Sequence, residues 1–586
     1  MARLASMSEV VVKNIRLWTL LIPILWMCCS SAPSSSPQLA LTASHDEAGR
    51  WASDTLEKLT LEEKVAQMIC EQMRGEYIAD NDEKFQYWAR LVRDYGVGAF
   101  VVYGGTPHDT AHLLNRLQKL AKIPLLITSD FEGGPGQQFA GASEFPANMA
   151  FSAIGSEELM YEAAKVGAIE GRAIGIHLTY SPVVDVLTRP GNPVLNVRSF
   201  GGDIELLGKM AGAYIRGYQE NGMLTTAKHF PGRGDVVLIP GTEYTVNDKP
   251  AEQVEAEDFA AFKKAIDAGV TYIMTEHIAI PSVTDGSELP ASVEGKLTTH
   301  WAREKLGFKG IVTSDDLWYE KIVDRFGAEK VGVMAIKAGH DALLKPANAI
   351  KMIETIVEAV KAGEIEEAQI DESVRKILYW KARLNLHRNR FVDLEQIHSL
   401  VGTKEHQDLV QQVAERSLTL LVNKDFFPTD AEKMGKLVHI SIQKREHHPA
   451  AVVVSNKLNN AFSVEETFFI GPNTSSELNR SALASAREAD TVILSLFNPR
   501  TAYVDNGPLS EKDLVFVREL VRIEPRTVVM SYGNPFLVES LKDAAAFAVG
   551  YGEGGFYGNQ VVYADAFIRL LKGEIEAKGK LPIPTS

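Results

Sequence analysis

Short apolar runs alternate with longer amphipathic stretches between about residues 50 and 386. The apolar runs predict buried strands, and the longer stretches, with apolar residues every three or four positions, predict helices. Strands joined by helices pair in parallel and are covered on both faces. About seven or eight such units predict a (β/α)8 TIM-like barrel at residues 48–386. Its predicted strands are 97–103, 124–130, 177–185, 223–229, 270–277, 310–315 and 341–345, and its predicted helices include 156–174, 204–219, 251–268 and 349–362.

Almost every predicted barrel strand ends in polar or ionisable residues. The C-terminal ends of all strands in a parallel barrel lie on one face, which is where active sites of this fold are built. The pattern therefore predicts one crowded polar pocket rather than a series of unrelated solvated strand ends. The residues in question are Asp130, Asp185, Lys228, His229, Glu276, His277, Asp315, Asp316 and Lys345.

A second α/β pattern follows the barrel. Residues 387–404 carry mixed charge and no clear strand, and they are interpreted as a linker. Residues 405–586 then predict a C-terminal α/β sandwich domain with a mostly parallel sheet. Its predicted strands are 419–422, 437–442, 452–455, 491–496, 527–531 and 547–551, with helices near 511–523 and 560–572.

Residues 1–40 are interpreted as a signal peptide followed by a Ser/Pro-rich spacer. Basic residues precede an apolar stretch at 17–29, which is too short for a comfortable membrane span and is followed by small residues. We therefore expect a secreted, periplasmic or cell-envelope protein. Cys28 and Cys29 leave a lipid anchor open as an alternative. Removal of this segment would leave Cys70 as the remaining cysteine, so no intramolecular disulfide is expected.

Composition narrows the class of partner. The chain of 586 residues is 45% hydrophobic and 23% charged, which is typical of globular proteins. Its net charge is -15 and no basic block occurs, which argues against nucleic acid or an anionic membrane as the main partner.

Several motifs follow one another in an order that is specific as a set. They are DFEGG at 130–134, FPANMA at 145–150, SPVVDV at 181–186, RSFG at 198–201, KHFPG at 228–232 and SDDL at 314–317. With these motifs in this order, the chain from about residue 54 onward resembles glycoside hydrolase family 3, in particular its bacterial β-N-acetylglucosaminidase branch in the two-domain form.

The resemblance implies an exo-acting, retaining β-glycoside hydrolase with Asp315 as nucleophile and without a cofactor or a catalytic metal. It assigns Asp130, Arg198, Lys228 and His229 to the hydroxyls of an oligosaccharide or glycoside substrate. Those roles make chemical sense, because a carboxylate accepts hydrogen bonds from vicinal hydroxyls, and Arg and Lys donate to their oxygens.

Asp316 directly follows the expected nucleophile. Adjacent residues at a strand end usually diverge, so we expect the Asp316 side chain to point away from Asp315 and to cap the following helix.

The family's usual proton donor is missing. Its acetylglucosaminidases follow KHFPG with His-Gly-Asp-Thr and then an Asp-x-His pair that supplies the acid/base. Here Arg233-Gly234-Asp235 follows KHFPG, a tripeptide to which no separate role is assigned. Ile239 and Gly241 occupy the positions of the pair, and neither can transfer a proton.

Other carboxyl groups are candidates for the missing acid/base. Glu243 lies in the same loop, beside Tyr244, and is the first candidate. Glu276 ends its own strand and would face the pocket. Asp505 and Glu553 of the second domain are weaker candidates.

The family's substrate-binding loop also differs, because Pro135 and Gln138 stand where related enzymes commonly have arginines. A β-N-acetylglucosaminide is therefore the first expectation for the substrate, and a β-glucosidase-type hydrolase is the alternative. A catalytically silent, glycan-binding envelope protein is a third interpretation. His229 and His277 have nearby carboxylates, but no metal-ligand spacing supports a metal site.

Overall fold

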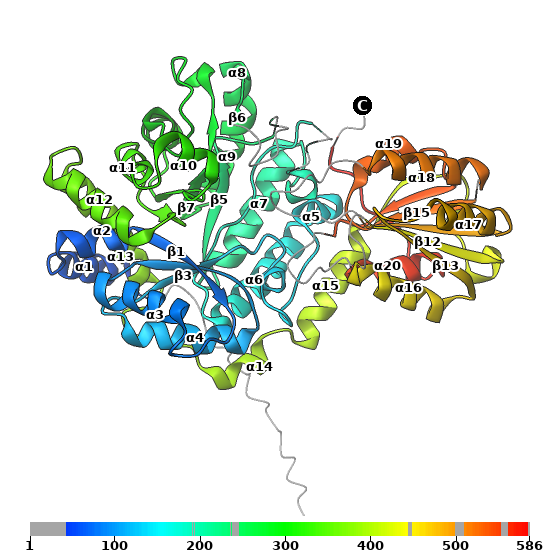
Figure 1. Ribbon diagram of the computed structural model, residues 1–586, viewed down its shortest axis with the longest axis horizontal. Coiled ribbons are helices and arrows are strands. Elements are labelled where there is room, and N and C mark those ends of the chain that lie inside the picture. The colour runs from blue at the N-terminus through cyan, green and yellow to red at the C-terminus, as the bar shows by residue number, and fades with distance from the viewer. Residues whose placement is uncertain are drawn as a thin grey trace, which may run out of the picture. The chain divides into compact units, whose positions relative to one another are not determined.

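Eight parallel strands form the first sheet, and helices surround it (Figure 1). In this computed structural model the described residues are 43–583 without 190, 191, 193, 235, 237–244, 444–447, 498–508, 525 and 553–560. A backbone bridge between Thr313 and Ala342 brings the two ends of the sheet together, which confirms the predicted barrel. In sheet order the strands are β10 (Leu343–Leu344), β1 (Ile69–Gly75), β2 (Ala99–Gly105), β3 (Leu126–Ser129), β4 (Leu178–Thr179), β5 (Leu224–Phe230), β7 (Tyr272–Thr275) and β9 (Ile311–Ser314).

Helices connect these strands, as the alternating pattern predicts. Two of them, α6 (Glu157–Ile174) and α7 (Ile204–Gln219), pack side by side. The others around the barrel are α1 (His45–Leu56), α2 (Leu61–Gln67), α3 (Glu83–Arg90), α4 (Pro107–Leu120), α5 (Asn148–Ile154), α8 (Ala251–Gln253), the π-helical turn Val254–Phe259, α9 (Ala260–Asp267), the π-helix Lys296–Lys305, α10 (Glu320–Phe326), α11 (Lys330–Lys337), α12 (Ala349–Lys361) and α13 (Glu367–Arg383).

The local sequence explains where α6 begins and ends. The Ser156 side chain accepts a hydrogen bond from the amide of Leu159, which satisfies one of the unpaired amides of the first turn. Gly175 ends the helix at a φ of 101°, a conformation that costs glycine little. Strand β5 is buried at every position, as expected for a parallel strand that is covered on both faces. No helix among the described residues has both the length and the apolar character needed to cross a bilayer.

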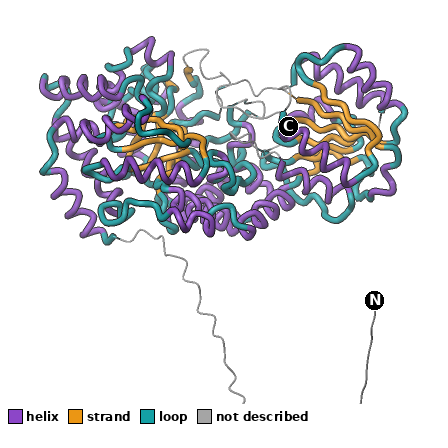
Figure 2. Tube along the Cα trace, turned by 60° about the horizontal axis from the view of Figure 1, so that its bottom comes forward, coloured by secondary structure: helices purple, strands orange, loops and turns teal. Residues whose placement is uncertain are grey.

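The second sheet has six strands, flanked by helices on both sides (Figure 2). All neighbours pair in parallel except β11 and β16, which are antiparallel. In sheet order the strands are β11 (Thr419–Asn423), β16 (Ala546–Val549), β15 (Thr527–Ser531), β14 (Thr491–Phe497), β12 (Leu437–Gln443) and β13 (Val464–Ile470). The helices of this domain are α15 (Lys404–Ser417), α16 (Pro449–Ala461), α17 (Ser476–Arg487), α18 (Glu511–Ile523), α19 (Val538–Leu541) and α20 (Val562–Leu571), and the short α14 (Ile397–Leu400) before them contacts α6 of the barrel.

Alternate residues of the second sheet supply two separate cores. In β14, Leu494 packs with residues of α17 and α18, whereas Ile493 packs with residues of α16 and α20. This alternation is the period of two that a strand imposes on its side chains.

The first of these two cores also contains barrel residues from α5, including Met149 and Ala153. Backbone hydrogen bonds join the same regions. The amide of Ala147 donates to Tyr551 O at 2.9 Å, and the amide of Lys580 donates to Ala153 O at 3.0 Å. The apolar side chains of α5 are therefore buried by both domains, with Phe151 in the barrel core and Met149 and Ala153 in the core shared with the second domain.

The predicted strand at 452–455 is wrong, because these residues lie within α16. The β-branched residues Val452 and Val453 favour a strand locally, but both are exposed, and burial instead falls on Ala450, Val454 and Leu458. That spacing is helical. Strands β1 and β13 were not predicted, because Glu71, Gln72 and Arg74 interrupt the apolar character of β1, and Glu465 and Glu466 interrupt that of β13.

Candidate active site

Polar residues from six neighbouring strands meet at the C-terminal end of the barrel, as the sequence predicts. They are Asp130 after β3, Asp185 after β4, Lys228 and His229 in β5, Glu276 after β7, Asp315 after β9 and Lys345 after β10. Arg198, in a short 3-10 turn at Asn196–Arg198, joins them from the segment that follows β4.

Asp315, Glu276 and His229 form the centre of the site. One polar atom of each side chain lies within 4.8 Å of the other two. The amide of Asp315 donates to Thr275 O at 2.9 Å, which ties the end of β9 to β7. Two carboxylates and an imidazole therefore lie close enough together to contact the same bound group.

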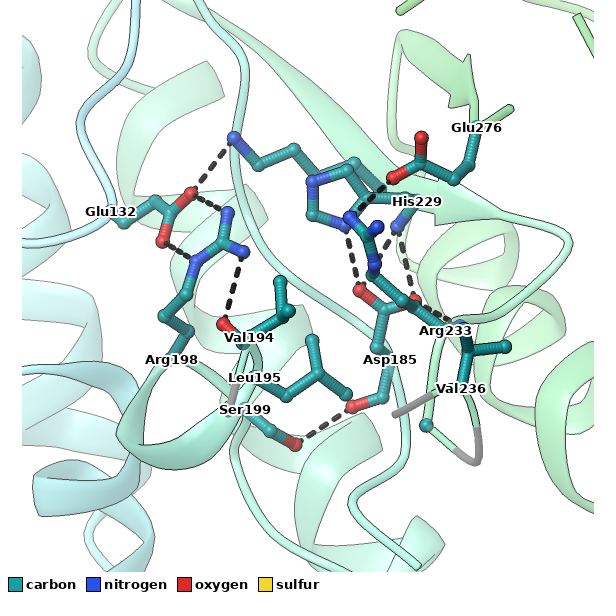
Figure 3. Close-up of polar contacts among 12 residues, drawn as sticks. Glu132, Asp185, Val194, Leu195, Arg198, Ser199, His229, Arg233, Val236 and Glu276 are labelled. Atoms are coloured by element: carbon teal, nitrogen blue, oxygen red, sulfur yellow. Dashed lines mark hydrogen bonds and ion pairs between the residues drawn. The ribbon is translucent and has the colours of Figure 1, made fainter. Parts of the chain in front are cut away.

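Asp185 holds His229. The Nδ1 atom of His229 lies 2.8 Å from Asp185 Oδ2, and because a carboxylate accepts, Nδ1 carries the proton. Asp185 also accepts from the Arg233 amide at 2.8 Å. Burial raises the pKa of Asp185. The imidazole of His229 and the backbone amides of Arg233 and His229 lower that pKa further than burial raises it. Figure 3 shows Asp185 beneath the imidazole ring of His229.

Arg233 and Glu276 form a buried ion pair beside this histidine (Figure 3). Arg233 Nη1 donates to Glu276 Oε2 at 2.7 Å, and Glu276 Oε1 accepts from the His277 amide at 2.8 Å. Burial raises the pKa of Glu276, but Arg233, followed by His229 and His277, lowers it further than burial raises it. The carboxyl group is therefore held in its ionised form. A divalent cation bound here would have to displace Arg233 from Glu276, so the pair disfavours a metal.

Glu132 joins the cations of the expected sugar-binding group. Arg198 donates to it through Nε at 2.7 Å and Nη2 at 2.6 Å, and Lys228 Nζ lies 2.9 Å from Glu132 Oε1. Lys228 also donates to Asp130 Oδ1 at 2.8 Å. Burial lowers the pKa of Lys228, but the two carboxylates outweigh it and raise the pKa. Asp130, Arg198 and Lys228 are therefore brought together, with Asp130 the most accessible of the three.

Comparison with known proteins identifies the family. Residues 60–379 match the Glycosyl hydrolase family 3 N terminal domain. The chain belongs to glycosyl hydrolase family 3. It is therefore a glycosidase, as expected from the sequence.

Two curated relatives of this family 3 chain carry sugar-specific names. It is 30% identical over 407 residues to the β-N-acetylglucosaminidase/β-glucosidase of Cellulomonas fimi. The aligned region covers 68% of this chain and 71% of that protein. It is also 26% identical over 390 residues to β-hexosaminidase A of Pseudoalteromonas piscicida. That alignment covers 61% of this chain and 64% of the relative.

Solved structures share the two-domain fold. The family 3 β-N-acetylglucosaminidase of Paenibacillus sp. superposes with a TM-score of 0.76 at 27% identity, over 90% of this chain and 99% of that one. The β-glucoside phosphorylase BglX has a TM-score of 0.80 at 24% identity, over 92% and 96% of the two chains, and at that identity it shows the fold alone.

The loop that departs from the pattern of family 3 begins in a fixed position. Asn192 Nδ2 lies 3.0 Å from both Gly234 O and Val236 O. Gly232 has a φ of 124°, and a Cβ there would lie 2.5 Å from Asp258 Oδ1. Burial raises the pKa of Asp258 to about 6, although Lys249, 2.8 Å away, opposes this. Glu243 lies further along this loop, outside the described residues.

Asp316 does not cap the next helix, so that prediction is wrong. Helix α10 begins at Glu320 without a side-chain cap. Asp316 Oδ2 instead accepts from Lys345 Nζ at 2.6 Å. Burial raises the pKa of Asp316 to about 6, with Lys345 opposing and Asp315 adding to the rise.

His277 supports the same turn. Its Nε2 atom donates to Asp316 O at 3.0 Å, and its ring stacks on Tyr319 with centroids 5.4 Å apart. This places His277 in a supporting role behind the turn that carries Asp315.

Sequence reasoning missed two supporting residues of the site. The sequence pattern marks Glu132 only as part of a motif, although it lies two residues after Asp130 and forms ion pairs with both Arg198 and Lys228. Arg233 was given no separate role, although it is the partner of Glu276. The available signal was that a buried pocket with Arg198 and Lys228 needs more acidic partners than Asp130 alone.

Proposed function

We propose that this chain is an exo-acting, retaining β-glycoside hydrolase that uses Asp315 as its nucleophile. The observation that carries the proposal is the convergence of Asp315, Glu276 and His229 within 4.8 Å at the C-terminal end of the barrel. Asp315 would attack the anomeric carbon while an acid protonates the departing glycosidic oxygen. Water would then hydrolyse the glycosyl ester with retention of configuration.

The terminal sugar binds to the group made by Asp130, Lys228, Glu132 and Arg198 in this proposal. These side chains are pre-oriented by ion pairs, so little ordering cost remains when hydroxyls replace or extend the contacts. His229 follows Lys228 in β5, and one of its ring nitrogens lies within 4.8 Å of Asp315. Its second ring nitrogen is an acceptor in the neutral ring, which suits a sugar hydroxyl as donor.

Glu243 is the acid/base that we propose. Glu276 lies beside Asp315, but Arg233 favours its ionised form. A carboxylate that is already ionised cannot protonate the leaving group. Glu276 would instead stabilise the positive charge that develops on the sugar ring in the transition state.

A β-N-acetylglucosaminide is the first substrate that we propose, because several relatives carry hexosaminidase names. A β-glucoside is the alternative, supported by the double name of the Cellulomonas fimi relative. The same family assignment argues against a protein that only binds glycans.

The test is turnover of a panel of nitrophenyl β-glycosides by the native protein and its variants. Asp315→Ala should lose at least about 10⁴-fold in kcat, and added azide should restore part of it by replacing the nucleophile. Turnover that survives in Asp315→Ala without azide would exclude Asp315 as nucleophile.

Glu243→Gln and Glu276→Gln separate the two remaining carboxyl groups. A proton donor matters most for poor leaving groups, so Glu243→Gln should spare nitrophenyl substrates and lose activity on alkyl glycosides. Glu276→Gln should lower turnover of both substrate types to a similar degree. The reverse pattern would assign the acid/base to Glu276.

We further propose that the chain is exported, since residues 1–40 have the pattern of a signal peptide. These residues lie outside the described structure. Cell fractionation of the tagged protein tests this, and a protein found only in the cytoplasm with residues 1–40 intact would contradict it.

A further inference from the structure

The indole ring of Trp318 lies exposed in the turn that follows the expected nucleophile, Asp315. Trp318 follows Asp315 by three positions, in the turn between β9 and α10. It is 49% exposed, whereas its neighbour Leu317 is completely buried. An indole combines a large apolar face with a hydrogen-bonding N–H, so an exposed tryptophan in the loop after a catalytic strand can serve as a binding surface.

The ring is held in place by charged neighbours. Trp318 Nε1 donates to Asp316 Oδ2 at 3.3 Å, the same oxygen that accepts from Lys345. The Lys345 ammonium lies 5.4 Å from the centroid of the Trp318 ring and 4.9 Å from that of Tyr103. These contacts fix the indole before any ligand arrives, which reduces the entropy cost of binding against it.

The backbone of Lys345 supports the interpretation of a ligand site. Its φ is 47°, in the left-handed region that lysine rarely adopts. Such strain is stored mostly at binding and active sites. In this backbone conformation the Lys345 ammonium group lies against Asp316 and the rings of Tyr103 and Trp318. The cluster thus offers an apolar ring surface with a fixed donor and acceptor at its edge.

This combination matches the chemistry of a pyranose ring. One face of a β-linked sugar presents C–H groups, which pack on an aromatic ring, and its rim presents hydroxyls, which bond to groups such as Lys345 and Asp316. A small apolar ligand would use only the ring, and a simple ion would use only the charges.

The position of Trp318 indicates which sugar of the substrate it contacts. The terminal sugar of an exo-acting enzyme enters the deeper, buried group around Glu132 and Lys228. The rest of the substrate must then extend toward solvent past Asp315, on the side where exposed groups lie. Trp318 is exposed and follows Asp315 on the same turn.

We propose that Trp318, fixed by Asp316 and Lys345, is the platform on which the leaving-group sugar stacks, and that it favours oligosaccharides over glycosides with small leaving groups. The inference rests on the proposed function, since it requires a glycosidase with Asp315 at its centre.

The test compares a β-linked disaccharide with the matching β-glycosyl fluoride, whose leaving group has no ring. In Trp318→Ala, kcat/KM for the disaccharide should fall about tenfold more than kcat/KM for the fluoride, mainly through KM. Trp318→Phe should recover most of the difference, because it retains an aromatic face. Phe391→Ala, at a residue that is 53% exposed and precedes α14, is the matched control and should change neither value.

An equal loss on both substrates would overturn the platform and make Trp318 a support for the Asp315 turn. Unchanged kinetics on both substrates would overturn it as well. If the native protein turns over the fluoride but Trp318→Ala shows no difference between substrates, the inference fails while the proposed function stands. If the native protein turns over neither substrate, the proposed function fails and the inference with it.

Discussion

Glu276 and Arg233 form a buried ion pair in which Oε2 and Nη1 are 2.7 Å apart, although they come from different strand ends of the barrel. The pair lies within the site that contains Asp315, and Arg233 is the main group that lowers the pKa of Glu276.

Arg233→Gln should raise the pH at which Glu276 titrates. Removal of the neighbouring cation destabilises the ionised form, so the pKa of Glu276 rises. The acidic limb of the kcat/KM profile should therefore move to higher pH, whereas Arg233→Lys should keep most of the native profile. An acidic limb that does not move in Arg233→Gln would show that Arg233 does not control the charge of the site.

Glu132→Gln should destabilise the protein because it removes the negative charge between two buried cations. Loss of one partner of a buried ion pair costs about 3–5 kcal/mol, since the remaining charge is left uncompensated. Chemical denaturation measures the effect. Glu157→Gln is the matched control, because its pair with Arg216 is 3.6 Å long and about half exposed, and it should cost less than about 0.5 kcal/mol.

Gly234→Ala should displace the loop that begins after β5. A Cβ at Gly234 would lie 1.8 Å from Val186 O, so the backbone beside Arg233 must move. Misplacement of a catalytic group by about 1 Å can cost about 100-fold, and we expect a loss of that order in kcat/KM. Gly49→Ala, in α1 with nothing within 4 Å, should leave kcat/KM unchanged and stabilise the fold slightly.

Asp258→Asn should change how stability depends on pH. The pKa of Asp258 is raised to about 6 in the folded protein, above its unfolded value near 4, so the folded state binds the proton more tightly. The native protein therefore loses stability as the pH rises from about 4 to about 6. Asn cannot titrate, so the stability of the variant relative to the native protein should increase over that interval. Denaturant midpoints at pH 4.5 and 7 measure it, and a constant difference would contradict the raised pKa.

The sequence was sufficient for the parts of the site that depend on topology. Parallel strands in a barrel expose their C-terminal ends on one face, so Asp315, Glu276 and His229 had to approach one another. The ionisable residues at these strand ends can be identified from the sequence without any knowledge of loop conformation.

The ion pairs could not be predicted because they depend on loop conformations. Arg233 and Glu276 are 43 residues apart, and Arg198 and Glu132 are 66 apart. No local pattern links such positions. The same limit explains the false strand at 452–455, where local preference for a strand was overridden by packing of α16 against the second sheet.

The contact between α5 and the second domain has a consequence for synthesis on the ribosome. The apolar residues Met149 and Ala153 are covered by segments that are translated long after the barrel, and the amide of Lys580 is among the last groups to reach α5. Domains generally fold in order as they emerge. Part of the apolar surface of α5 therefore lacks its cover until those segments emerge, and we expect chaperones that recognise such surfaces to bind the nascent chain during this interval.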